Sequence, residues 1–224
     1  EAQDMFTFRE ALRTRPLLTV IGFKSTFAFA YLNFFVHIVA YAEGVGLTKD
    51  EAALSLSLIG GASVLGRVVI GIVADRAGTL RTLICSMIVL TACVGLWTFI
   101  TSKISILILC CFYGFFAGGF PSLPPSIIAE YYSDVASKSL FQVIGVNFFL
   151  ETPGAILGPT LIGLVYDETG SYEAGSYITA GFMILGLVIL STIPTTESWE
   201  MMIQSKMNEE EEVDVNVNTS NSKL

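Results

Sequence analysis

The sequence predicts an all-α membrane protein built as a bundle of six transmembrane helices. Three observations predict this class. Hydrophobic residues make up 53% of the 224 residues and charged residues only 14%, whereas soluble domains carry about 25% charged residues. Six segments are apolar over the roughly 20 residues that a helix needs to cross a bilayer. The connections between these segments are short and polar, so neighbouring helices must run antiparallel.

The six expected helices follow one another with little chain between them. Their predicted ranges are Leu17–Tyr41, Ala52–Ala74, Leu83–Ile100, Ile104–Ile128, Leu140–Val165 and Tyr177–Ile193. Thr48 and Glu51 have the spacing of a capping box that opens the second helix. Gly170 is a suitable C-terminal stop for the fifth.

Prolines predict interruptions in the fourth and fifth helices, because proline lacks the N–H that a helix interior needs. The residues concerned are Pro121, Pro124, Pro125, Pro153 and Pro159. Neighbouring broken helices in a membrane protein point to a solute pathway.

Charge divides the chain into three expected regions. Residues 1–16 are polar and basic, and we expect them to be the end of a cytosolic loop that follows an upstream part of a longer protein. Residues 17–193 form the six-helix bundle. Residues 194–224 contain seven acidic residues and two lysines, and so carry −5 of the net charge of −8. A segment of that composition predicts a disordered acidic tail.

The distribution of Lys and Arg predicts the orientation. Eight of the twelve lie on the side shared by both termini: Arg9, Arg13, Arg15, Arg76, Arg81, Lys138, Lys206 and Lys223. The opposite loops hold only Lys49 and Lys103. By the positive-inside rule both termini are cytosolic, and we expect a multi-pass protein of the plasma membrane. The acceptor sequence at Asn218 would then stay unglycosylated.

Three acidic or strongly basic residues fall inside the expected helices: Lys24, Arg67 and Glu151. Helical rise places them roughly 12–18 Å from the cytosolic end, where a charge costs at least about 2.5–3.5 kcal/mol. Two cations and one anion leave a surplus positive charge that a substrate carboxylate would neutralise. Arg67 is the better anchor, because its planar group binds a carboxylate through two parallel hydrogen bonds.

The other two charges have alternative roles. Glu151 is expected to pair with Arg67 when the site is empty, or to carry a coupling proton. Alternatively it makes a structural ion pair with Arg67, or a hydrogen bond between helices. Lys24 either provides counter-charge or extends its long side chain to the membrane surface.

Polar and aromatic side chains extend the predicted substrate site. Asn33 and Asn147 are costly to bury without partners, so we expect them to face a cavity. Tyr31 and Phe116 belong to aromatic clusters on the helices that would line it. No catalytic, metal-binding or cofactor-binding motif and no basic nucleic-acid-binding patch is found, so the sequence predicts a non-enzyme that binds a small molecule within the lipid bilayer.

A loop motif resembles that of the major facilitator superfamily. Residues 71–81 read GIVADRAGTLR, similar to the G-x-x-x-D-R-x-G pattern, followed by basic residues, that joins the second and third helices of each six-helix half in that family. The resemblance implies the C-terminal half of a twelve-helix fold. It also implies that Asp75, Arg76 and Arg81 act as a cytosolic gate.

A second resemblance, to the monocarboxylate transporters, covers most of the chain. It is carried by residues 35–42, Gly66-Arg67, residues 121–125, residues 157–159 and residues 163–172. It implies alternating access and often proton-coupled transport of small carboxylates, with Arg67 as the substrate anchor and Glu151 at a family acidic position. Ser63 stands one turn before Arg67, where the lactate carriers of the family have an aspartate. Branches that carry aromatic amino acids, thyroid hormones or vitamins therefore stay open.

The leading hypothesis is a secondary active transporter of a small organic solute, a monocarboxylate or a related anion. Its expected partners are the substrate, a co-transported proton and the N-terminal six-helix half. Two alternatives are a non-transporting membrane sensor that signals through the acidic tail, and an inert half-transporter.

Overall fold

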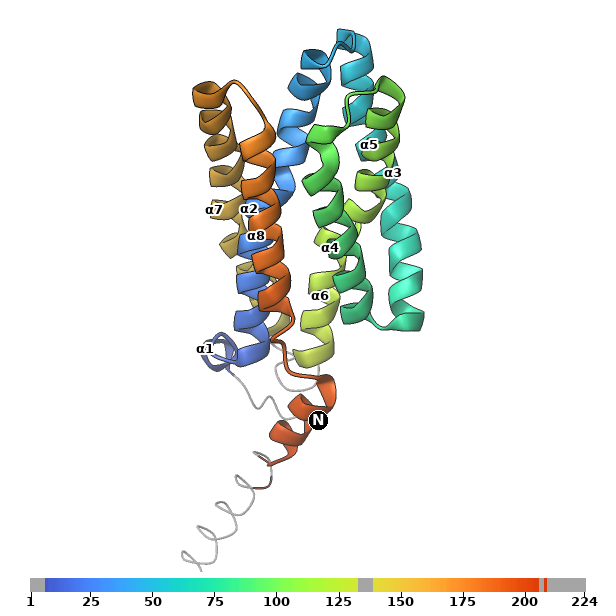
Figure 1. Ribbon diagram of the computed structural model, residues 1–224. Coiled ribbons are helices and arrows are strands. Elements are labelled where there is room, and N and C mark those ends of the chain that lie inside the picture. Colours follow the sequence, from blue (N-terminus) through green and yellow to red (C-terminus); the bar gives the residue numbers. More distant parts are fainter. Residues whose placement is uncertain (1–6, 133–138, 206–207, 209–224) are drawn as a thin grey trace, which may run out of the picture. The chain divides into compact units, whose positions relative to one another are not determined.

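The computed structural model describes residues 7–132, 139–205 and 208, and contacts within the chain divide it into a unit ending at Thr192 and a second unit from Ile193. The first unit is helical throughout its described part (Figure 1). Its elements are α1 (Phe8–Ala11), α2 (Arg15–Gly44), α3 (Lys49–Ala77), α4 (Thr79–Leu96), η1 (Trp97–Phe99), α5 (Lys103–Ala117), α6 (Gly119–Tyr132), α7 (Leu140–Thr169) and α8 (Glu173–Leu190).

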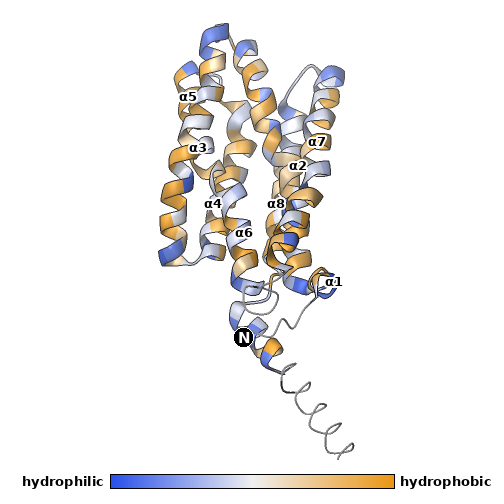
Figure 2. Cartoon of the chain, turned by 180° about the vertical axis from the view of Figure 1, so that it is seen from behind, coloured by the Kyte–Doolittle hydropathy of each residue, from blue (hydrophilic) through white to orange (hydrophobic). Residues whose placement is uncertain are grey.

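Six segments of the described chain are long and apolar enough to cross a membrane. Four are the single helices α2, α3, α7 and α8, whereas α4 with η1 forms one span and α5 with α6 another. Hydrophilic residues gather at the two ends of these spans and hydrophobic residues lie between (Figure 2). The predicted fold class, a six-helix membrane bundle, is confirmed.

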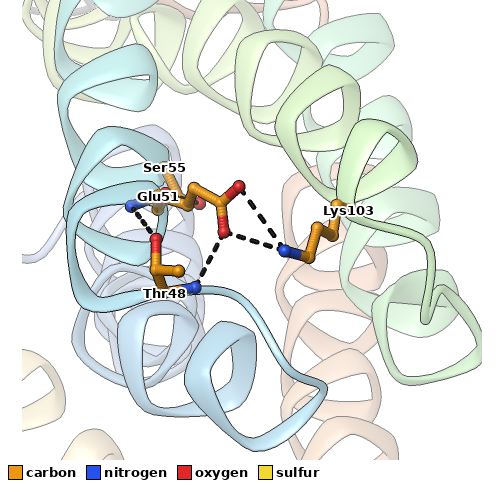
Figure 3. Close-up of polar contacts among 4 residues, drawn as sticks. All are labelled: Thr48, Glu51, Ser55 and Lys103. Atoms are coloured by element: carbon orange, nitrogen blue, oxygen red, sulfur yellow. Dashed lines mark hydrogen bonds and ion pairs between the residues drawn. The ribbon is translucent and has the colours of Figure 1, made fainter.

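The predicted capping box at the start of α3 is confirmed (Figure 3). The Thr48 N–H donates to a carboxylate oxygen of Glu51 at 2.8 Å, and the Glu51 N–H donates to the Thr48 hydroxyl at 3.3 Å. The same Glu51 carboxylate accepts from Lys103 at 3.1 Å. One residue therefore both begins α3 and ties it to the first turn of α5. At the end of α7, Gly170 has φ +66°, the left-handed stop that the sequence predicted.

The two proline-containing spans differ in the structure. The fourth span is interrupted at Gly118, between α5 and α6 and just before Pro121, but α6 continues unbroken through Pro124 and Pro125, where interruptions were also predicted. The predicted interruption of the fifth span is wrong, because α7 continues as one 30-residue helix through Pro153 and Pro159. Neighbouring helices can support a proline-containing helix in a membrane, and α2 packs closely along α7 in this region.

Glycines bring two pairs of helices into backbone contact. A Cβ added to Gly158 of α7 would lie 1.7 Å from the Phe29 carbonyl oxygen of α2. A Cβ added to Gly66 of α3 would lie 1.9 Å from the Phe115 carbonyl oxygen of α5. Only glycine fits at such distances, as in other small-residue helix interfaces in membranes. These interfaces fix the rotation of α7 on α2 and of α3 on α5.

The second unit begins at Ile193, within the region expected to be disordered. Residues 196–205 are helical, and the Ser198 N–H donates to the Thr195 hydroxyl at 3.3 Å, as at a helix N-terminus. Trp199 and Ile203 are buried and lie four residues apart, on one helix face. The disorder predicted from composition is therefore wrong for residues 196–205. The glutamate run at 209–212 and Asn218 lie outside the described residues.

Candidate functional site

The intramembrane charges are organised around an ion pair between Lys24 of α2 and Glu151 of α7. The Lys24 side chain is fully buried, and that of Glu151 is 21% exposed. The expectation that Lys24 extends to the membrane surface is therefore wrong, since burial holds it inside the bundle. The partner of Glu151 in this structure is Lys24, not Arg67.

Aromatic rings surround the buried ammonium group of Lys24. Its Nζ lies 4.0 Å from the ring centre of Phe148 on α7 and 5.6 Å from that of Phe120 on α6. Ring faces attract cations, and the attraction grows when water is excluded. The ion pair and the two rings together offset part of the cost of burying this charge.

Arg67 lies on the exposed face of α3, eight residues from its predicted cytosolic end at Asp75. Within the described part of the chain it makes no ion pair. Gly118, at the break between α5 and α6, packs on its backbone: a Cβ there would lie 2.8 Å from the Arg67 amide nitrogen and 3.1 Å from its Cγ. The guanidinium is thus held on a helix whose backbone is fixed, with its charge free for another partner.

Tyr31 of α2 shares a neighbour with Lys24, since its ring centre lies 4.6 Å from that of Phe120. Its hydroxyl donates to the carbonyl of Ala117 at 3.3 Å. The carbonyl of Tyr31 itself accepts from the Tyr113 hydroxyl at 2.7 Å. Tyr31 is therefore linked to the Lys24–Glu151 pair through Phe120 and to Arg67 through Ala117 and Gly118.

The remaining predicted substrate residues occupy different environments. Ser63 is buried one turn before Arg67, and its hydroxyl donates to the Gly60 carbonyl of its own helix at 2.9 Å. Phe116 is half-buried on α5, with its ring centre 5.3 Å from that of Phe115. Asn33 is directed toward α8, where its side-chain amide donates to the Thr179 hydroxyl at 3.0 Å.

Asn147 is the unusual member of the predicted set. Only 1% of it is exposed, and neither side-chain polar atom finds a hydrogen-bond partner among the described residues. It lies on α7 one turn before Glu151. A buried amide without partners costs free energy, so this position has hydrogen-bonding capacity to spare beside the ion pair.

At the end of the bundle that holds the α3–α4 turn, Asp75, Arg76 and Arg81 are all exposed. The described residues show no ion pair among the three, so their role as a gate stays a prediction. Two contacts that the sequence did not indicate tie this end together. Thr79 donates to Glu130 of α6, and the hydroxyls of Thr14 and Tyr132 share a hydrogen bond.

A separate cavity of about 180 Å³ lies at the opposite end of the bundle. It is lined by Tyr41, Thr98, Phe99, Ser171, Tyr172 and Glu173. Burial raises the pKa of the Tyr172 hydroxyl in this wall. None of the predicted substrate residues lines it, and no group of three His, Cys, Asp or Glu in the described chain could hold a metal ion.

A family model matches most of the chain, residues 18–202, and it is that of the Major Facilitator Superfamily. This chain belongs to the Major Facilitator Superfamily. The resemblance of its 71–81 motif is thereby confirmed, and the bundle is an integral, multi-pass membrane unit of that superfamily.

Among curated relatives, the superfamily chain is similar to monocarboxylate transporters. It is 30% identical to monocarboxylate transporter 12 of Xenopus laevis over 149 residues, which cover 62% of this chain and 31% of the relative. It is also 30% identical to human monocarboxylate transporter 7 over 151 residues, or 64% of this chain and 28% of the relative. The similarity to monocarboxylate transporters that the sequence indicated is thus found in these relatives, and the matched region spans about a third of their length.

Two further similarities widen the comparison. The aspyridones efflux protein apdF of Emericella nidulans is 25% identical over 138 residues, covering 62% of this chain and 28% of the relative. A solved structure of an auto-inhibited POT family peptide transporter superimposes with a TM-score of 0.65 at 15% identity, covering 81% of this chain and 39% of the other. The latter supports the fold alone.

Proposed function

We propose that this six-helix unit works as half of a secondary active transporter that moves a small organic anion, in first place a monocarboxylate. A second six-helix unit would complete the transporter, and the pathway would open alternately to either side. The names of the relatives support transport in general: two are monocarboxylate transporters and one is an efflux protein.

One observation carries the proposal: Arg67, part-way along a transmembrane helix, has no ion-pair partner among the residues that the structure describes. Lys24 and Glu151 neutralise one another, so the surplus positive charge belongs to Arg67. A charged group at this depth normally faces a cavity or a partner of opposite sign. A carboxylate fits best, because it takes two parallel hydrogen bonds from the guanidinium.

Glu151 has a second proposed role, as the group that responds to the substrate. Its side chain is partly exposed whereas that of Lys24 is not, so the carboxylate is the end of the pair that solvent or solute can approach. Protonation of Glu151 would leave Lys24 charged, which gives the unit a means of coupling anion movement to a proton. Ser63 carries no ionisable group that could replace Glu151 in this step.

The test is uptake by the complete transporter in proteoliposomes. The substrates are four ¹⁴C-labelled carboxylates: acetate, L-lactate, benzoate and L-tryptophan. Arg67→Ala is expected to raise the KM of the transported member about 10- to 100-fold, because charge-assisted hydrogen bonds are lost. Arg67→Lys should recover part of the loss, since it restores the charge without the paired geometry.

The matched control is Lys103→Ala. Lys103 is another cation of a membrane-spanning helix, but it is 51% exposed and paired with Glu51 at the far end of the bundle. Exposed pairs contribute little, so we expect a KM within about twofold of the wild type. Unchanged uptake by Arg67→Ala would contradict the proposal.

A further inference from the structure

The break between α5 and α6 leaves a backbone carbonyl without its usual donor. In an α-helix the N–H of residue 121 would bond to the carbonyl of residue 117. Position 121 is proline, which has no N–H. The carbonyl of Ala117 therefore cannot take this helical hydrogen bond, and the helix ends at this residue. Ala117 is fully buried, so water does not readily replace the missing donor.

The donor that the structure supplies comes from another helix. The Tyr31 hydroxyl of α2 donates to the Ala117 carbonyl at 3.3 Å. The Tyr31 ring is fixed by its neighbours, with its centre 4.6 Å from that of Phe120 and 6.4 Å from that of Tyr113. A hydrogen bond of this length exceeds the usual 2.5–3.0 Å for two oxygens, so it is weak enough to be exchanged for another partner.

We propose that Tyr31 is a positioning residue for the junction of α5 and α6 at residues 117–119, which we call the α5–α6 bend. It holds this bend in place by supplying the hydrogen bond that Pro121 removes. The bend also contacts the proposed anion site. Gly118 follows Ala117 directly and packs on the backbone of Arg67. The Tyr31 hydroxyl thus links α2 to the α5–α6 bend, which packs on Arg67.

A second step rests on the proposed function. The Tyr31 hydroxyl bonds to the residue directly before Gly118, and Gly118 packs on Arg67, while an anion held by Arg67 is a stronger acceptor than a neutral carbonyl. A bound carboxylate therefore draws the hydroxyl from Ala117, and the bend loosens. Substrate occupancy is thereby converted into a change in the broken span that packs on the anion site.

The first test is a double-mutant cycle measured by hydrogen–deuterium exchange of the complete protein in lipid nanodiscs. Tyr31→Phe keeps the ring and removes the hydroxyl, and it should speed exchange of the backbone amides within 118–123, Pro121 having none, about two- to fivefold. Pro121→Ala restores an N–H for the Ala117 carbonyl. In that background Tyr31→Phe should have no effect on the same amides. An equal effect in both backgrounds would overturn the proposal.

Tyr41→Phe is the matched control. Tyr41 lies on the same helix and also donates to backbone carbonyls, those of Thr98 and Ile100, each at 3.1 Å. These carbonyls lie at the opposite end of the bundle. The substitution should leave exchange at 118–123 unchanged, whereas faster exchange there would show that loss of any α2 hydroxyl loosens the bend.

The second test separates this inference from the proposed function. The carboxylate whose uptake requires Arg67 is added at saturating concentration, and exchange at 118–123 should rise in the wild type but not further in Tyr31→Phe. If that carboxylate leaves wild-type exchange unchanged, the transfer of the hydroxyl is wrong and the transport proposal stands. If uptake does not require Arg67, the transport proposal falls and only the double-mutant cycle bears on Tyr31.

Discussion

The Lys24–Glu151 pair is the residue-scale feature with the largest expected effect on stability. Glu151→Leu leaves a buried ammonium without counter-charge, which costs about 3 kcal/mol, the lower end of the range for buried pairs, because Glu151 is 21% exposed. Replacing both residues, as Lys24→Met with Glu151→Leu, should restore stability to within about 1 kcal/mol of the wild type. Thermal unfolding in detergent micelles measures both.

The double variant is also the control, because it removes the pair without leaving a charge behind. If the single variant is as stable as the double variant, the ammonium is not buried in the way that the structure shows. Uptake adds an independent measure, since the double variant should fold and yet lose any coupling that depends on Glu151.

The sequence predicted which residues carry charge inside the membrane but not which of them pair. Lys24, Arg67 and Glu151 were identified because apolar helices make ionisable residues conspicuous. Pairing depends on how one helix is rotated against another. Here Gly154 and Gly158 set that rotation for α7 on α2, and their contacts with particular carbonyls cannot be read from spacing within either helix.

At the scale of elements, close glycine contacts predict where an added methyl group is tolerated. Gly66→Ala should destabilise the bundle by about 1–3 kcal/mol, the usual cost of overpacking, because its Cβ would collide with the Phe115 carbonyl of α5. Gly61→Ala on the same helix is the control. Nothing lies within 4 Å of its added Cβ, so it should be neutral or slightly stabilising, since alanine favours helix over glycine.

Thermal unfolding in detergent distinguishes the two variants. A Gly66→Ala protein that melts together with Gly61→Ala would mean that α3 and α5 do not meet as closely as their glycines indicate. The comparison isolates packing, because both substitutions raise helix propensity equally.

The ends of helices were predicted more accurately than the breaks within them. Thr48, Glu51 and Gly170 act through local geometry, so the sequence predicted their roles correctly. Pro121 and Pro153 have the same local effect and different outcomes, because α7 has α2 packed along it through successive glycines. The positions of the prolines in the sequence do not show whether a neighbouring helix will support them.

For the whole molecule, the bias of Lys and Arg predicts an orientation that cysteine labelling can check. In a complete transporter freed of its native cysteines, Ser102→Cys should react with a membrane-impermeant maleimide in intact cells, because it lies in the connection before α5. Ala77→Cys, exposed at the end of α3, should react only after the cells are opened. The reverse pattern would contradict cytosolic termini.

The free charge of Arg67 has a consequence for membrane voltage. While Glu151 stays ionised and cancels Lys24, the described part of this unit carries one net positive charge within the bundle when empty and none when an anion binds without a proton. A charge that crosses the full potential exchanges about 2.3 kcal/mol per 100 mV. An inside-negative potential should therefore slow net uptake, which needs the empty site to return outward, and leave anion-for-anion exchange unaffected. Potentials set with potassium and valinomycin in proteoliposomes compare the two modes, and equal sensitivity would show that the returning site is not charged.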